Sequence, residues 1–169
     1  MSAVIPAGVR SDGTRRAFWV EGGLADRQHP TLAEITSGVD ISCYLTIPGI
    51  TTTTDQATIT DQRLCSSQDF QIPGRKTKSI TLEYTFNLNE PAEDTARTEL
   101  TEGSVGDLVI VYQVDEDEAV ATSDWVKVWP LKLGEQNESA VAANALDRIT
   151  QTGFVVGEVT DFVQIVGGS

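Results

Sequence analysis

Two runs of apolar, largely β-branched residues near the middle of the chain predict its central strands. The runs cover residues 107–114 and 124–133, with a polar linker between them. Successive side chains of a strand point to opposite sides, so each run divides into two faces, and both faces are partly apolar. One face consists of Leu108, Ile110, Tyr112 and Val114 in the first run and of Trp125, Trp129, Leu131 and Leu133 in the second. We therefore predict an antiparallel pair that is covered on both sides, within a β-sandwich or at a subunit contact.

The linker between the two runs starts with four consecutive acidic residues, Asp115–Glu118. Like charges oppose close pairing, so we expect an open, solvated turn. A calcium loop would need glycine and carboxylates spaced along the chain, and this run has neither. We therefore do not predict a metal site here.

Alternation of apolar and polar residues predicts further strands on both sides of this pair. The expected strands are 17–20, 39–46, 77–88 and, as one long strand or two strands joined by a bend, 148–166. In the third of these the apolar face consists of Ile80, Leu82, Tyr84, Phe86 and Leu88. Residues 46–63 contain a Pro-Gly turn and a threonine run, and we expect a long inter-strand loop or a hairpin arm continuing through 57–63. The fold class is mainly β.

One short helix and one longer helix are expected. Thr31 and Glu34 have the spacing of a capping box, and Gly38 would end that helix within two turns. A second helix, Pro91–Leu100, has proline at its first position and a narrow apolar stripe at residues 92, 96 and 100. One helix packed against a β body is the interpretation that this pattern favours.

Length and charge restrict the domain organisation and the partners. The 169 residues predict a single domain, 1–169, with residues 1–16 as a mobile N-terminal arm. A net charge of −13 argues against binding to nucleic-acid phosphates and to anionic membrane surfaces. We find no apolar run long enough to cross a bilayer and no secretory signal, and we expect synthesis in the cytoplasm.

Candidate catalytic and metal-binding residues are few. His29 lacks an identifiable nucleophile or orienting partner, and we expect a solvated loop residue. Cys43 falls on the apolar face of its predicted strand and is expected to be buried, whereas Cys65 lies in a polar stretch. The basic cluster Arg75, Lys76 and Lys78 is too small for a nucleic-acid site. We predict no enzyme activity, no metal and no cofactor.

Four segments resemble, in order, the major tail (tail tube) proteins of bacteriophages with long, non-contractile tails (siphovirus type) that infect actinobacteria. The segments are GVDISCYL, TDQATITDQRLCSSQDFQIPG, DWVKVWPLKLGEQ and RITQTGFVVGEV, and the resemblance extends from about Phe18 to Val166. It implies a β-sandwich or barrel with one flanking helix, here Pro91–Leu100, and strands that join a shared inner barrel on oligomerisation.

The same resemblance implies a structural virion protein. Six copies would close into a ring, and rings would stack into a tube through which genomic DNA passes without specific binding. The implied partners are further copies of the chain, the tape measure protein inside the tube, and the distal tail and tail terminator proteins at its ends. The subunit would not insert into a membrane. The segment 46–63 would reach a neighbouring ring through Thr51, Thr52, Thr53, Thr54, Asp55 and Gln56.

Other functions stay open at this point. A monomeric β-sandwich that binds carbohydrate or a receptor would use an aromatic platform formed by Trp19, Trp125 and Trp129. Another virion component, such as a tail terminator or a decoration protein, would share the fold class. A hydrolase is the most distant alternative, because no catalytic pattern is recognisable.

Overall fold

A single antiparallel sheet of eight strands organises the computed structural model, which describes residues 2–168. The strand order is β2-β1-β5-β6-β7-β4-β3, and β8 pairs with β6. The strands are β1 (Arg15–Glu21), β2 (Val39–Asp40), β3 (Leu45–Asp61), β4 (Phe70–Thr85), β5 (Val105–Tyr112), β6 (Trp125–Glu138), β7 (Arg148–Val155) and β8 (Val163–Gln164). The helical elements are α1 (Leu32–Ser37), the 3-10 turn η1 (Pro91–Glu93) and α2 (Thr95–Glu99). The predicted mainly β fold is confirmed, and no helix within residues 2–168 has the length and apolarity needed to cross a bilayer.

The predicted central pair is β5 and β6, with Leu108 opposite Trp129 in the middle of the sheet. Both faces are covered. The first cluster contains Leu108, Ile110, Trp129 and Leu131 together with residues of β1, β4, β7 and α2. The second contains Val109, Val111, Val126 and Val128 with residues of β1, α1 and the C-terminal segment. The two-sided apolar pattern therefore reflects real burial on both faces.

One residue of this pair changes face. Val114, expected beside Leu108 and Ile110, packs in the second cluster instead. Gln113 has a φ of 60°, which interrupts the alternation after β5 ends at Tyr112. Side chains beyond such a residue no longer follow the parity of the strand.

The first helix forms as predicted. The Thr31 side chain accepts a hydrogen bond from the Glu34 backbone N–H, Glu34 reciprocates, and the helix ends before Gly38. Ile35 is fully buried in the second cluster, so α1 covers that face of the sheet. A Cβ atom at Gly38 would lie 2.8 Å from the Trp19 carbonyl oxygen, which explains glycine at this close approach.

The second helix is shorter than predicted. In place of one helix over Pro91–Leu100, the chain forms η1, breaks at Asp94 and then forms the single helical turn α2. The carboxylate of Asp94 is buried and accepts hydrogen bonds from the Asn87 backbone N–H and the Arg97 side chain. These contacts tie residue 94 to the preceding segment, and its φ of −125° is not helical.

Cys43 is exposed, contrary to the expectation that it is buried. The predicted strand 39–46 stops after Asp40, because the Asp40 carboxylate accepts hydrogen bonds from both the backbone and the hydroxyl of Ser42. This side-chain turn bends the chain after the buried Ile41, and β3 starts only at Leu45. Cys43 therefore lies on the turn and not on an apolar strand face.

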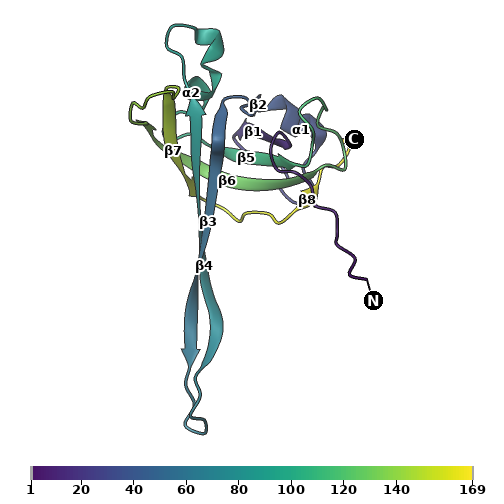
Figure 1. Cartoon of the computed structure of the whole chain (residues 1–169), viewed down its shortest axis with the longest axis vertical. Helices are drawn as coiled ribbons and strands as arrows, with labels where there is room; N and C mark the ends of the chain where they lie inside the picture. Colours follow the sequence, from purple (N-terminus) through teal and green to yellow (C-terminus); the bar gives the residue numbers. More distant parts are fainter. Residues whose placement is uncertain (1, 169) are drawn as a thin grey trace.

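The segment 46–63, expected as a loop or hairpin arm, is a strand through Asp61. It forms most of β3, which pairs with β4 to make a hairpin that extends far below the body of the molecule (Figure 1). In the C-terminal region, β7 and β8 form the strand–bend–strand alternative predicted for 148–166. At the other end of β4, the strand stops at Thr85, so Leu88 is exposed instead of joining the predicted apolar face.

Candidate assembly surfaces

The β3–β4 hairpin is held by the body only at its base. β4 pairs with β7 from Ile80 to Thr85, whereas its residues 70–79 have β3 as their only partner strand among the described residues. β3 pairs with β4 alone within the described chain. A two-stranded ribbon is marginal by itself in water, and its open edges are templates for pairing with another chain. The hairpin is therefore the element that most requires a partner.

The predicted contact residues Thr51–Gln56 lie where the hairpin leaves the body. All six are exposed on β3, opposite residues 76–81 of β4. Residues opposite one another in a ladder share a face. Thr52, Thr54 and Gln56 consequently lie on the side of Lys76 and Lys78, and the other three lie on the reverse side. The structure thus forms a continuous polar ladder from these residues.

The far half of the hairpin carries apolar residues that the sequence interpretation missed. Ile59 is directly opposite Ile72, and Phe70 lies two residues further along the same face by register. All three side chains are about half exposed. The alternation in ATITD and FQIP was the available signal, but it does not distinguish a buried strand from an exposed hairpin.

The N-terminal arm is a second exposed segment. Residues 2–13 contain no strand, and Val4, Ile5 and Val9 are exposed. The arm leaves the body beside β8 and points to the same side as the hairpin (Figure 1). The arm is predicted to end at residue 16, but Arg15 and Arg16 already belong to β1. Residue 1 lies outside the described residues.

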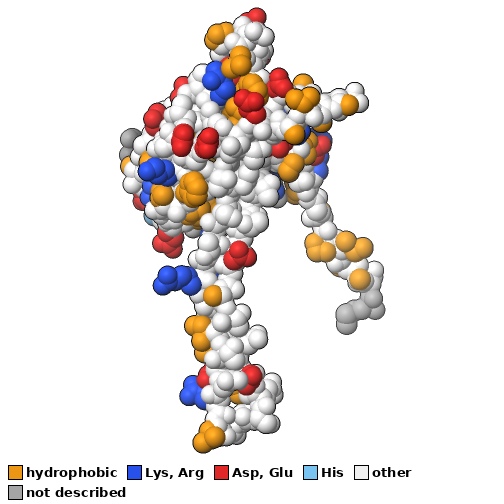
Figure 2. Space-filling view, turned by 90° about the vertical axis from the view of Figure 1, so that its left-hand side faces the viewer, with side chains coloured by type: hydrophobic (Ala, Val, Ile, Leu, Met, Phe, Trp, Pro, Cys, Tyr) orange, Lys and Arg blue, Asp and Glu red, His pale blue; other side chains and the backbone are white. Residues whose placement is uncertain are grey.

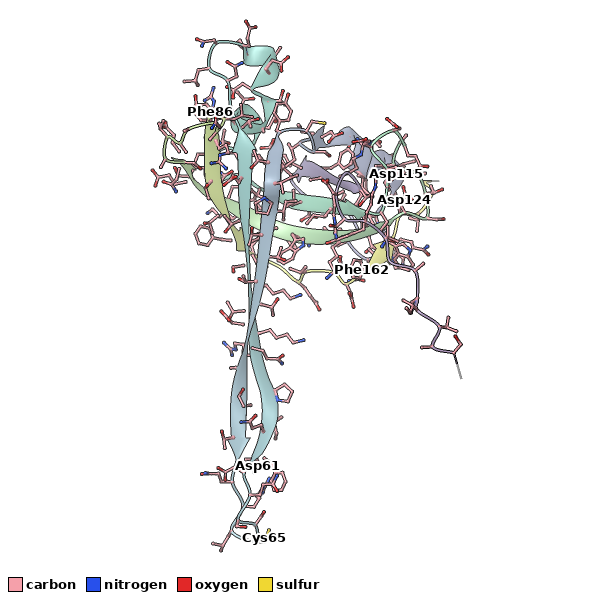
Figure 3. All side chains as sticks on the ribbon, in the orientation of Figure 1. Asp61, Cys65, Phe86, Asp115, Asp124 and Phe162 are labelled. Carbon is pink, nitrogen blue, oxygen red and sulfur yellow. The ribbon has the colours of Figure 1, made fainter. Side chains whose placement is uncertain are left out.

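The acidic run Asp115–Glu118 forms a turn on the side of the body away from the hairpin (Figure 3). The Arg16 guanidinium donates to the backbone carbonyl oxygens of Asp115, Glu116 and Glu118 at 3.4, 2.6 and 3.1 Å. The carbonyl groups are thus occupied by the arginine, and within residues 2–168 no group of acidic, histidine or cysteine side chains has the arrangement of a metal site.

Two of the three residues of the basic cluster form one wall of a groove. Lys76 and Lys78 of β4 line it together with Lys127 of β6, and the opposite wall consists of Val155 at the end of β7 and of residues 157–161. The groove has a volume of about 630 Å³ and includes Glu158 and Asp161. The mixed charge on its walls makes it unlike a phosphate-binding surface, which concentrates lysine and arginine.

The remaining candidate residues do not form a site with one another. His29 is exposed and contacts Asp26 at 2.9 Å, and this hydrogen bond lowers the pKa of the Asp26 carboxyl group. Cys65 is exposed at the far end of the hairpin (Figure 3). Trp19 and Trp129 are buried in the first cluster, which leaves Trp125 alone of the three tryptophans for an aromatic platform. The carbohydrate-binding alternative therefore lacks the three-tryptophan platform on which it was based.

A comparison with protein families identifies one family whose model matches this chain. Residues 2–168 match the model of a family described as phage tail tube protein. No curated protein matches the chain at a significant level. The match covers almost the whole chain, including the hairpin and the arm.

Proposed function

The chain belongs to the phage tail tube protein family, and from this premise we propose that six copies close into a ring and that rings stack into the tube of a long, non-contractile tail. Membership makes it a structural component of the virion that assembles with itself and with other tail proteins. The proposal rests on one observation: beyond its base, the long hairpin has no covering partner strand among residues 2–168. In a closed ring its edges would pair with neighbouring copies, which removes them from solvent.

In the proposed tube the hairpins contribute strands to a shared inner barrel. Barrels of about 16–18 strands already enclose an aqueous channel, so several strands from each of six copies would enclose a wide one. Genomic DNA would pass through during delivery to the host. The tape measure protein would occupy the channel beforehand, and distal tail and terminator proteins would cover the ends. The role involves no catalytic step, no cofactor and no membrane insertion, and the subunit would be made in the host cytoplasm.

The net charge supports passage without binding. Six copies at −13 each would carry −78 per ring. DNA carries one negative charge per ~1.7 Å of its axis, so an acidic lumen would repel it over the screening distance of about 8–10 Å at physiological salt. A net positive lumen in an assembled tube would contradict this part of the proposal.

Thr51–Gln56 are proposed as part of the contact between rings. Deleting Thr51–Thr54 removes an even number of strand residues, so the faces of β3 are preserved beyond the deletion. We expect a subunit with an unchanged thermal midpoint that does not form tubes, because the buried clusters contain none of these residues. Circular dichroism and electron microscopy measure the two effects. Normal tubes from the deletion variant would refute the assignment.

Negative-stain electron microscopy across a concentration series tests the function itself. We expect stacked rings or hollow tubes with a central channel above a critical concentration. Particles of one chain, 18.2 kDa, at every concentration would contradict self-assembly as the property of this chain.

A further inference from the structure

The loop at the end of the hairpin presents one apolar side chain on an ordered support. Residues 62–69 connect β3 to β4, and Leu64 is fully exposed there. The loop is braced internally: Ser66 N–H donates to the Arg63 carbonyl oxygen, Gln68 N–H donates to Ser66 Oγ, and Gln62 donates to Asp69. A fully exposed leucine is unremarkable alone, but here a fixed loop projects it at the tip of the longest element of the molecule.

A shallow pocket lies at the opposite end of the molecule. It is lined by the segment that follows β4, including Phe86 and Leu88, and by Leu146 of the loop before β7. Leu88 and Leu146 are 66% and 73% exposed. The pocket volume is about 620 Å³, within the range of ~300–1,000 Å³ typical of ligand sites. It is therefore large enough to receive a side chain and part of a loop.

The tip and the pocket lie at the two ends of the long axis. Figure 3 shows Cys65 at the end of the hairpin and Phe86 in the opposite part of the molecule, below the segment that forms the upper end, and Figure 2 shows hydrophobic side chains at both ends. A contact between different surfaces of identical chains propagates without limit when the copies are displaced along an axis. Opposite ends of an elongated subunit have the geometry that stacking requires.

The tip carries one basic side chain that can meet acidic side chains at the pocket. Arg63 is the only basic residue of the loop 62–69, which also contains Asp69, and it contacts Asp61 at the surface. The pocket is lined by Glu93 and Asp147, for which the described residues provide no ion pair. An exposed ion pair such as Arg63–Asp61 contributes little, so Arg63 is free to exchange partners.

We propose that the hairpin tip of one copy docks into the Phe86–Leu88–Leu146 pocket of a second copy in the adjacent ring, with Leu64 as the apolar anchor. This inference rests on the proposed stacking function and identifies its receiving surface. It also assigns Arg63 to the carboxylates at the pocket. Every copy then uses its tip toward one ring and its pocket toward the other.

The native Cys65, next to Leu64, permits a direct test by cross-linking. In a Cys43→Ser background, Leu146→Cys places a thiol in the pocket. After assembly and mild oxidation with diamide, non-reducing electrophoresis should show a ladder of multimers, because each copy forms one disulfide at its tip and one at its pocket. Val141→Cys, in the same loop but outside the pocket, is the matched control, and adding Cys65→Ser should abolish the ladder. Tubes that give no ladder, or an equal ladder from the control, would overturn the docking.

Charge placed at either surface should weaken stacking without unfolding the subunit. Leu64→Asp and Leu146→Asp should each raise the critical concentration for tubes on the order of tenfold to a hundredfold, as expected for losing one buried leucine contact. Val141→Asp, which replaces an exposed apolar side chain outside the pocket, should leave the critical concentration unchanged. Circular dichroism and thermal midpoints verify folding.

The outcomes separate this inference from the proposed function. If the wild-type chain forms tubes and the Leu64 and Leu146 variants form them equally well, the docking is wrong and the tube function stands. If the wild-type chain forms no tubes at any concentration, the stacking function fails and the docking fails with it.

Discussion

At the scale of single residues, a buried polar network fixes α2 against the sheet. Tyr84 Oη donates to Gln151 Oε1 at 3.0 Å, and Gln136 Nε2 donates to Tyr84 Oη at 2.9 Å. Both glutamines also donate to the Leu100 carbonyl oxygen at the end of α2. Burial raises the pKa of Tyr84 to about 12. The network is satisfied only while the phenol keeps its proton.

This pKa predicts a loss of stability at high pH. The unfolded phenol ionises near pH 10, so the stabilisation from the neutral, buried Tyr84 is complete below pH 10 and disappears as the pH rises toward 12. The change is at most about 2–3 kcal/mol, since one pKa unit corresponds to ~1.4 kcal/mol. Urea denaturation at several pH values measures it. Tyr84→Phe should be less stable at pH 8 and should lose part of the decline above pH 10; an identical decline would exclude Tyr84 as its source.

At the scale of elements, each face of the central strands has its own cover. The first cluster is closed by β4, β7 and α2, and the second by α1 and the C-terminal segment. The isolated bridge between Thr31 and Val166 joins the start of α1 to that segment. The helix therefore positions the segment around Val166 as well as covering the sheet.

Removing the cap of α1 should weaken this cover. Thr31→Ala deletes the acceptor for the Glu34 backbone N–H, and the loss of an N-cap typically costs about 1 kcal/mol. We expect a lower free energy of unfolding in urea, with Thr31→Ser restoring most of it because the hydroxyl is retained. An effect of Thr31→Ser as large as that of Thr31→Ala would indicate that the threonine methyl group, and not the cap, is responsible.

At the scale of the whole molecule, a body with a buried core carries two exposed extensions, the β3–β4 hairpin and the N-terminal arm. The fully buried side chains gather around β5 and β6. Residues 2–13 are exposed, and the part of the hairpin beyond residue 56 of β3 is exposed except for a few half-covered positions (Figure 1). A surface of this kind is expected of a subunit whose remaining burial occurs on assembly. The net charge of −13 acts against that assembly through repulsion between copies.

Salt should therefore promote tube formation. Raising the ionic strength from about 0.01 M to 0.1 M shortens the screening length from about 30 to 10 Å, which weakens repulsion between acidic copies more than contacts at the interface. We expect the critical concentration, measured by sedimentation and electron microscopy, to fall over this range. A critical concentration that rises with salt would mean that attraction between opposite charges dominates the assembly.

The sequence by itself determined the elements whose signals are local. Two-sided apolar alternation identified β5 and β6 and their antiparallel pairing, because side-chain parity follows from backbone geometry alone. The capping box and Gly38 identified α1 because its first and last hydrogen bonds are made within a few residues. The resemblance to phage tail tube proteins, based on four segments in order, is likewise a property of the chain, and the family match confirms it at the level of the tail tube family.

Only the tertiary structure decided where side-chain hydrogen bonds override the alternation or the helical pattern along the chain. Cys43 became exposed because Asp40 and Ser42 form a turn, and the predicted helix broke at Asp94 because its carboxylate binds Asn87 and Arg97. The exposure of Ile59 and Leu64 depends on β4 leaving the sheet at Ile80, which alternation along one strand does not encode. Periodicity predicts which residues share a face of a strand. What covers that face depends on the rest of the fold, and for the hairpin we propose that it depends on another copy of the chain.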